Sequence, residues 1–306
     1  MHETDTSSPG FCSDVQGEPL PGTAKTGSTY VLFEWPGPWS RDVLDGGTFD
    51  AELTGKLKAL TKQHRASLLL IRHPSREGRA ISDHHVYLVF AEQAVIEVLH
   101  VNSPEDLLTL DLSGPGRNGA TLRKDPLLLV CTHAKRDACC AVKGRPLLRE
   151  LAKRYPWTPG RDLVWETSHI KGHRFAPTML LLPWAYSFGR MNGEASDALL
   201  RHALAGRFFL PGNRGRGTLD APAQAAELAV AQRLIADGFP LAYGELEVGT
   251  LLIDATRTHT TVTHPTSEIA FEVELERRVV DGVISSCGDA PKAGKSWEVV
   301  ALRRAN

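Results

Sequence analysis

Two cysteines and two histidines near the middle of the sequence have side chains and spacings that suit a metal site. Cys131 and Cys140 are nine positions apart, and His169 and His173, four positions apart, follow about thirty residues later. Thiolates and imidazoles favour iron or zinc, and carboxylates, the hard oxygen ligands, are not prominent in either segment. These residues therefore predict an iron–sulfur or zinc site.

The wide cysteine spacing favours iron over zinc. Structural zinc sites usually have about two to four residues between paired ligands, whereas a two-iron cluster is larger and tolerates a longer loop around it. Two cysteines on one iron and two histidines on the other is the ligand set of Rieske centres. Because imidazole ligands carry N–H groups that titrate, uptake of an electron can be coupled to uptake of a proton.

Two other functions stay open from these residues alone. One is a thioredoxin-like thiol oxidoreductase that uses Cys131 or the adjacent pair Cys139 and Cys140. Against it, the sequence has no Cys-x-x-Cys motif, the arrangement that lowers the pKa of a nucleophilic thiol. The other is a zinc-stabilised binding module that uses the C-terminal β-rich segment as its interaction surface.

Two segments carry a resemblance to a known family. Cys-Thr-His-Ala-Lys-Arg-Asp-Ala-Cys-Cys, residues 131–140, and Thr-Ser-His-Ile-Lys-Gly-His-Arg-Phe-Ala, residues 167–176, resemble the sucrase/ferredoxin-like family. The resemblance extends more weakly over about residues 10–237. It implies a thioredoxin-like ferredoxin that carries one electron at a time between a reductase and an acceptor protein. It also implies a [2Fe–2S] cluster with four ligands: Cys131, Cys140, His169 and His173.

The resemblance assigns the second thiolate to Cys140 rather than Cys139, because the family keeps eight residues between its cysteines. Around the ligands we expect His133, Arg136, Cys139 and Lys171 as neighbours, and backbone N–H groups after Cys131 as donors to sulfur. Arg136 and Asp137 are expected to form an ion pair that holds the loop.

The sequence departs from the family at Lys171, where a second glycine is usual before Gly172. A left-handed backbone at that position would be strained by lysine. Despite the family label, no pair of carboxylates suited to glycoside hydrolysis stands out, and we expect no cleavage of sucrose.

Composition excludes several classes of protein. The 306 residues include 35 Lys and Arg against 36 Asp and Glu, so we expect no general nucleic-acid binding. Five cysteines do not form a disulfide framework, and no apolar run is long enough to span a membrane. We therefore expect a soluble cytoplasmic protein with reduced thiols. Cys12 is expected to be a small buried side chain and Cys287 to lie in a turn without a functional role.

The pattern of apolar residues and turn signals predicts an α/β protein in four parts. These are a polar lead-in over residues 1–28, an αβ domain over 29–113, a thioredoxin-like ferredoxin domain over 120–238 and a small antiparallel β extension over 239–306. The first αβ domain repeats the element order of the second, which a duplication would explain. The glycine-rich basic segment Gly212–Gly217 is expected to be an exposed loop, and docking of an acidic redox partner is one role left open for it.

Overall fold

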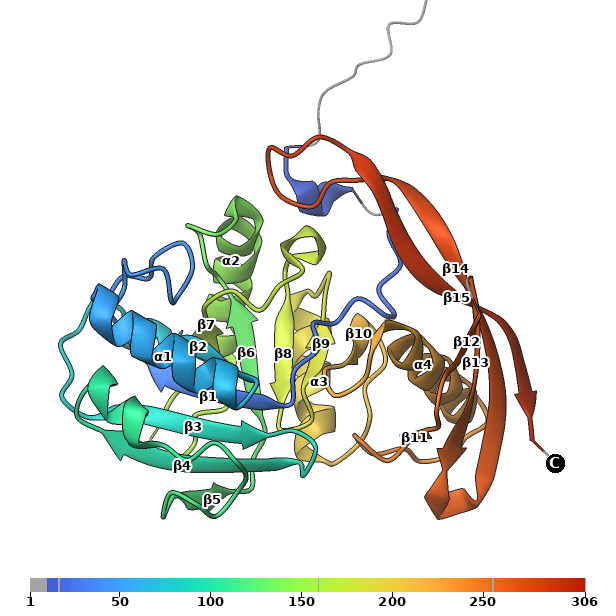
Figure 1. Ribbon diagram of the computed structural model, residues 1–306, viewed down its shortest axis with the longest axis horizontal. Helices are drawn as coiled ribbons and strands as arrows, with labels where there is room; N and C mark the ends of the chain where they lie inside the picture. The colour runs from blue at the N-terminus through green and yellow to red at the C-terminus, as the bar shows by residue number, and fades with distance from the viewer. Residues whose placement is uncertain (1–9, 16, 159, 255, 306) are drawn as a thin grey trace, which may run out of the picture.

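The computed structural model describes residues 10–15, 17–158, 160–254 and 256–305, which form two β-sheets and the helices packed on them (Figure 1). The large sheet has the strand order β10-β9-β8-β6-β7-β2-β1-β3-β4-β5. Its strands are β1 (Thr29–Glu34), β2 (Ala66–Arg72), β3 (His84–Phe90), β4 (Val95–Val101), β5 (Thr121–Arg123), β6 (Leu127–Cys131), β7 (Val164–Thr167), β8 (Met179–Leu182), β9 (Tyr186–Phe188) and β10 (Asn213–Arg216).

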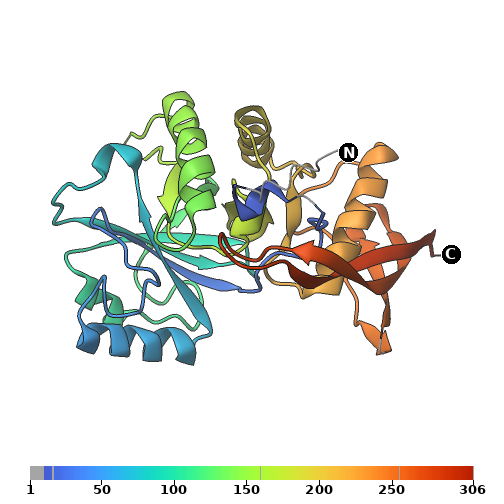
Figure 2. The ribbon, with the colours of Figure 1, turned by 90° about the horizontal axis from the view of Figure 1, so that it is seen from above.

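The smaller sheet is antiparallel and lies at the C-terminal end of the chain. It consists of β11 (Glu247–Val248), β12 (Leu252–Asp254), β13 (Arg257–His264), β14 (Ile269–Val283) and β15 (Lys292–Arg304). The α-helices are α1 (Ala51–Gln63), α2 (Ala138–Arg154), α3 (Gly193–Leu204) and α4 (Ala221–Ala236). The predicted fold class, α/β with a small C-terminal antiparallel sheet, is confirmed. Figure 2 shows α1 and α2 beside the large sheet, and α4 beside the smaller one.

The large sheet contains two units of the same topology, β1-α1-β2-β3-β4 and β6-α2-β7-β8-β9. In each unit the first two strands are parallel, the third is antiparallel to the first, and the fourth is antiparallel to the third. The equivalent strands β2 and β7 pair antiparallel and join the units into one sheet. This arrangement is what a duplicated αβ unit predicts. Both sides of the expected boundary at residues 113–120 contribute strands to this sheet, and the division into domains stays a prediction.

A buried ion pair spans the seam between the two units. Arg72 and Glu166 are register partners on β2 and β7, and the Arg72 guanidinium donates two hydrogen bonds, of 2.8 and 2.9 Å, to the Glu166 carboxylate. Both side chains are buried, and Arg72 also pairs with the half-exposed carboxylate of Glu77 at 2.9 Å.

Capping and packing position the second helix. Asp137 is its N-cap, because the carboxylate accepts the backbone N–H of Cys139 at 3.0 Å. The buried side chains Leu147, Leu148 and Leu151 then pack with Leu128 of β6 in one apolar core. The helix therefore begins at Ala138 and includes both Cys139 and Cys140.

The C-terminal extension shares this core. Val262, Phe271, Val273 and Leu275 on the inner face of the small sheet cluster with Leu228 of α4. Residues Ile269–Val283 form one long strand, β14, whose pairing with β15 contains register shifts. Figure 1 shows the β14–β15 hairpin turning at its tip over the N-terminal 3-10 helix η1 (Cys12–Asp14).

The expectation of an exposed basic loop at Gly212–Gly217 is wrong. Asn213–Arg216 forms β10, and Arg214 is buried, with its Nε donating to the Thr23 hydroxyl and Nη1 to the Lys171 carbonyl. Arg216 forms an ion pair with buried Glu227. Within the described residues, none of the helices combines the length and apolar character that crossing a membrane requires.

Candidate metal centre

Parallel pairing of β6 and β7 brings the two predicted ligand segments to the same edge of the sheet. Cys131, the last residue of β6, is the register partner of Thr167, the last residue of β7. His169 follows Thr167 by two residues, and the short 3-10 helix η4 (His173–Phe175) follows next. Residues 131 and 169 therefore meet because carboxyl ends of parallel strands share one edge.

A close approach of α2 to the end of β6 adds the second cysteine. A Cβ atom at Gly144 would lie 2.2 Å from the Cys131 carbonyl oxygen, so only glycine lets the helix pack this near the strand. Cys140 lies on the first turn of the same helix. The ligand atoms of Cys131, Cys140 and His169 all lie within 4.8 Å of one another, as a metal centre requires.

His173, the fourth predicted ligand, lies beside His169 but outside this group of three. The two imidazole rings have their centroids 5.2 Å apart. The ring nitrogens of both histidines are buried, and within the described residues none of these four atoms has a hydrogen-bond partner. Buried polar atoms are normally paired, and a metal group beside the two buried thiols would take one nitrogen of each ring.

The two cysteines titrate unequally. The Cys140 thiol donates a hydrogen bond to the Cys131 sulfur, and this bond, together with His169, holds the pKa of Cys131 well below its usual range despite complete burial. The same bond raises the pKa of Cys140, and burial raises it further. Thiolates are the metal-binding form of cysteine, so Cys131 is prepared for ligation without a metal present.

The neighbours predicted around the ligands are found in part. The backbone N–H of His133 donates to the Cys131 sulfur, while the His133 ring bonds the Ser40 carbonyl at 2.8 Å. Arg136 forms its ion pair with Asp42, at 3.4 Å, so the predicted pairing with Asp137 is wrong. Asp137 instead caps α2 and places its Oδ2 3.6 Å from Nε2 of His173.

The histidine loop has a left-handed backbone at Lys171, the position where the sequence has lysine in place of the usual glycine. Lys171 has φ of 68° and Gly172 has φ of 83°. A Cβ atom at Gly172 would also lie 2.4 Å from a guanidinium nitrogen of Arg214. Buried Arg214 therefore packs directly under the turn that delivers His173, a contact that the sequence pattern did not predict.

Cys139 belongs to a different group from Cys140. Its sulfur lies 3.3 Å from that of Cys12 and 3.1 Å from that of Cys287, and the carboxylate of Asp137 completes the group. Cys12 is buried as expected, but Cys287 is packed against two other thiols rather than standing alone in a turn. In the sequence, the only sign of this group was that Cys12 and Cys287 had no predicted function.

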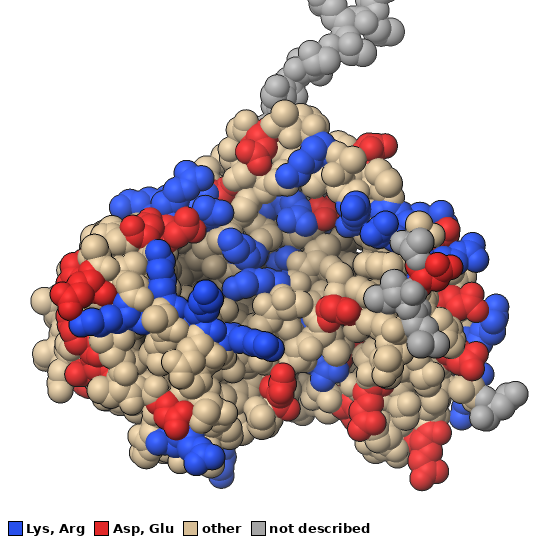
Figure 3. Space-filling model, in the orientation of Figure 1, with Lys and Arg blue, Asp and Glu red and all other residues tan. Residues whose placement is uncertain are grey.

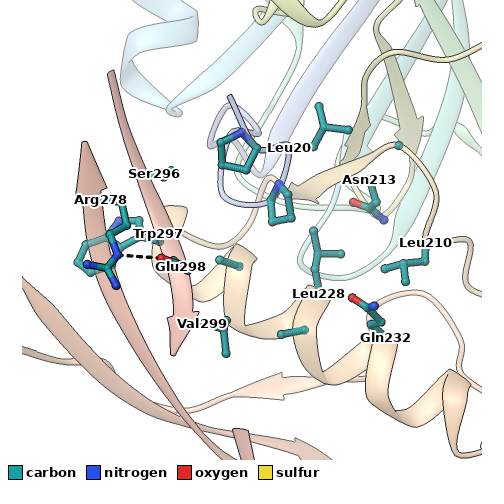
Figure 4. A pocket seen from close by; sticks show the side chains of 15 residues that line it. Leu20, Leu210, Asn213, Leu228, Gln232, Arg278, Ser296, Trp297, Glu298 and Val299 are labelled. Carbon is teal, nitrogen blue, oxygen red and sulfur yellow. Dashed lines mark hydrogen bonds and ion pairs between the residues drawn. The ribbon is translucent and has the colours of Figure 1, made fainter. Parts of the chain in front are cut away.

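The structure also contains a pocket that lies away from these cysteines. A pocket of 530 Å³ opens between α4, β15 and the segment that precedes β1, and apolar side chains such as Leu20, Leu228 and Trp297 line much of it (Figure 4). Arg278 donates to Glu298 at 2.8 Å beside it. None of its described lining residues is a cysteine or a histidine, so the metal-ligand chemistry lies elsewhere.

Comparison with known proteins agrees with the resemblance of the ligand segments. Residues 20–215 match a family model described as sucrase/ferredoxin-like, a range that includes all four predicted ligands. The match is shorter than the predicted span of residues 10–237, and it leaves out Cys12 and the C-terminal sheet. No curated protein and no solved structure matches the chain.

Proposed function

The chain belongs to the sucrase/ferredoxin-like family, and on that premise we propose that it is a one-electron carrier with a [2Fe–2S] cluster. Cys131 and Cys140 would bind one iron, and His169 and His173 the other. The observation that carries the proposal is the meeting of two buried thiols with His169, beside His173, where the ring nitrogens of both histidines are buried and have no hydrogen-bond partner among the described residues. Soft sulfur with imidazole nitrogen is a donor set for iron or zinc, and the family favours iron.

A bound cluster would supply reversible one-electron chemistry, and the protein's contribution is to hold it and to control access. The two thiols are buried between the sheet and α2, whereas the two histidines are only partly buried. Electrons would therefore exchange with a partner on the histidine side. Asp137, beside Nε2 of His173, is placed to stabilise a proton on that nitrogen, which supports a coupling of electron and proton uptake.

The partners we propose are a reductase and an acceptor that carry acidic patches. Lys and Arg side chains gather around a hollow at the centre of one face of the molecule (Figure 3). Lys135 and Lys171, close in sequence to the ligands, are exposed. Basic side chains around a redox centre speed the encounter with an acidic partner, and this effect weakens with salt.

Burial opposes the thiol oxidoreductase. Cys131 and Cys140 are each about 1% exposed, so a disulfide substrate cannot reach either sulfur without opening the fold. A thiolate must attack the disulfide sulfur directly, and access is therefore part of the rate. Zinc at this same site stays an alternative that metal analysis separates from iron.

Histidine variants test the proposal at the residues that carry it. His169→Ala and His173→Ala should lose the iron and the visible absorption of the purified protein, because each removes a ligand to the histidine-bound iron. His100→Ala is the matched control, since His100 is a half-exposed histidine paired with Asp83 on the surface. Full iron content in both ligand variants, or zinc in place of iron in the unmutated protein, would overturn the proposal.

A further inference from the structure

Three cysteines from distant parts of the chain meet beside the candidate metal centre. Cys12 comes from η1, Cys139 from the first turn of α2 and Cys287 from the tip of the β14–β15 hairpin. The pairs Cys12 and Cys139, Cys139 and Cys287, and Cys287 and Cys12 have sulfur separations of 3.3, 3.1 and 3.7 Å. Each sulfur therefore contacts both of the others.

A carboxylate is the fourth member of the group. Oδ1 of Asp137 lies 3.9 Å from the Cys12 sulfur, and one ligand atom from each of the four residues falls within a 4.8 Å span. The backbone N–H groups of Cys139 and Cys287 hold this carboxylate at 3.0 and 2.9 Å, and the Ser286 hydroxyl holds it at 2.7 Å. Its position is thus fixed by α2 and by the hairpin together.

We propose that Cys12, Cys139, Cys287 and Asp137 form a second metal site, which binds one zinc ion. Zinc takes thiolate ligands at about 2.3 Å, so the sulfurs of a tetrahedral site are about 3.8 Å apart, close to the observed triangle. Three sulfurs in mutual contact and a carboxylate fill the four positions of a closed structural site. Binding releases the thiol protons to solvent.

A disulfide accounts for these positions less completely. It joins two sulfurs, leaves the third thiol unpaired and the Asp137 carboxylate as a helix cap only, and it also needs an oxidant. An iron–sulfur cluster at this group is disfavoured as well, because its three cysteines could not all bind one iron, and sulfurs on different irons stand farther apart than these. A single thiophilic ion uses all four side chains.

The zinc site would tie η1 and the tip of the β14–β15 hairpin to the first turn of α2, beside the proposed cluster. Cys12 and Cys287 lie outside the family match, whereas Cys139 is next to the proposed cluster ligand Cys140. Lys143 of α2 already pairs with Asp14 of η1 at 2.6 Å, across the same contact. Bound zinc would hold η1 and the hairpin tip in place against the first turn of α2.

Zinc and iron counted on the same sample test the site. The full-length protein, purified anaerobically from zinc-supplemented cells, should hold about one zinc per chain. In the double variant Cys12→Ser/Cys287→Ser the zinc should fall at least tenfold with the iron unchanged. Cys131→Ser should give the opposite pattern, with the iron lost and the zinc kept. The zinc content therefore tests the second site independently of the proposed cluster.

Thiol mapping by mass spectrometry provides a second measurement. In the unmutated protein Cys12, Cys139 and Cys287 should resist alkylation until zinc is removed with a chelator. If the double variant does not fold, Cys287→Ser alone, at a partly exposed position, takes its place. Absence of zinc from the unmutated protein, zinc retained in the variant, iron in its place, or a disulfide among the three cysteines would each overturn the proposal.

Discussion

Cys139 and Cys140 are adjacent on the first turn of α2, yet their sulfur atoms belong to different groups of side chains. Cys140 joins Cys131 and His169, and Cys139 joins Cys12 and Cys287. Neighbouring residues on a helix point about 100° apart, so one turn can serve two centres. Asp137, which caps the same turn and belongs to the second group, also lies 3.6 Å from Nε2 of His173.

This division predicts opposite results for two neighbouring substitutions. Cys140→Ser should lose iron and visible absorption, because even residues that only support a ligand cost about 10- to 100-fold in metal affinity when changed. Cys139→Ser should keep both, since its sulfur lies in the other group. Iron and sulfide analysis with absorption spectra of the two variants checks the prediction. Loss of iron from Cys139→Ser alone would exchange the roles of the two cysteines.

The turn before His173 predicts a contrast between two more neighbours. Gly172→Ala should destabilise the fold by at least about 1–2 kcal/mol, because alanine disfavours the left-handed backbone and its Cβ displaces Arg214. Lys171→Gly should change stability by no more than about 1 kcal/mol, since relief of strain offsets the added chain entropy. Chemical unfolding of both variants is the measurement. If Gly172→Ala were as stable as the unmutated protein, the turn would not require glycine at this position.

The buried ion pair at the seam predicts a large effect of a conservative change. Glu166→Gln removes the buried charge that pairs with Arg72 and one of its two acceptor oxygens, and it should cost about 1.5–3 kcal/mol of unfolding free energy, because Glu77 at 2.9 Å still pairs with the guanidinium. The control is Glu52→Gln, which breaks the exposed pair with Lys56 and should cost less than about 0.5 kcal/mol. Equal effects on the urea midpoint would show that the seam does not depend on this pair.

Glu227 predicts a specific dependence of stability on pH. Complete burial raises its pKa to about 7, from an ordinary 4.5, although Arg216 at 2.8 Å acts in the opposite direction. Between these values the folded state binds more protons than the unfolded state. Stability is therefore highest below pH 4.5 as far as this group is concerned, and it is lost as pH rises towards 7, by about 3 kcal/mol.

Glu227→Gln, which cannot ionise, should remove this dependence. The hydrogen bond with the Tyr186 hydroxyl can be kept, because an amide oxygen still accepts. Urea midpoints at several pH values between 4.5 and 8 should decline more steeply for the unmutated protein than for the variant. Parallel declines would mean that Glu227 is ionised in the fold across the whole range.

Local signals in the sequence were enough for most elements, and Cys131, Cys140 and His169 from the predicted ligand set do meet in the structure. The strands His84–Phe90 and Val95–Val101 are runs of mostly apolar residues, a pattern typical of buried strands. β10 was missed because Asn-Arg-Gly-Arg has the composition of a loop, and Arg214 is buried there only because Thr23 and the Lys171 carbonyl accept its hydrogen bonds. Such compensation depends on tertiary contacts, which no window of sequence contains.

The second group of cysteines was beyond local prediction for the same reason. Cys12 and Cys287 are separated by 275 positions, and no motif spacing links them to Cys139. They meet because the β14–β15 hairpin is long enough to reach η1. The start of α2, by contrast, is indicated in the sequence by Asp137. As the N-cap residue it fixes where the helix begins, and therefore where both cysteines on the first turn lie.

The most direct test of the account is the visible absorption spectrum of anaerobically purified protein before and after dithionite, with iron and sulfide measured on the same sample. The account predicts a brown protein that bleaches on reduction and contains about two irons and two sulfides per chain. A colourless protein without iron or sulfide would contradict the electron-carrier function.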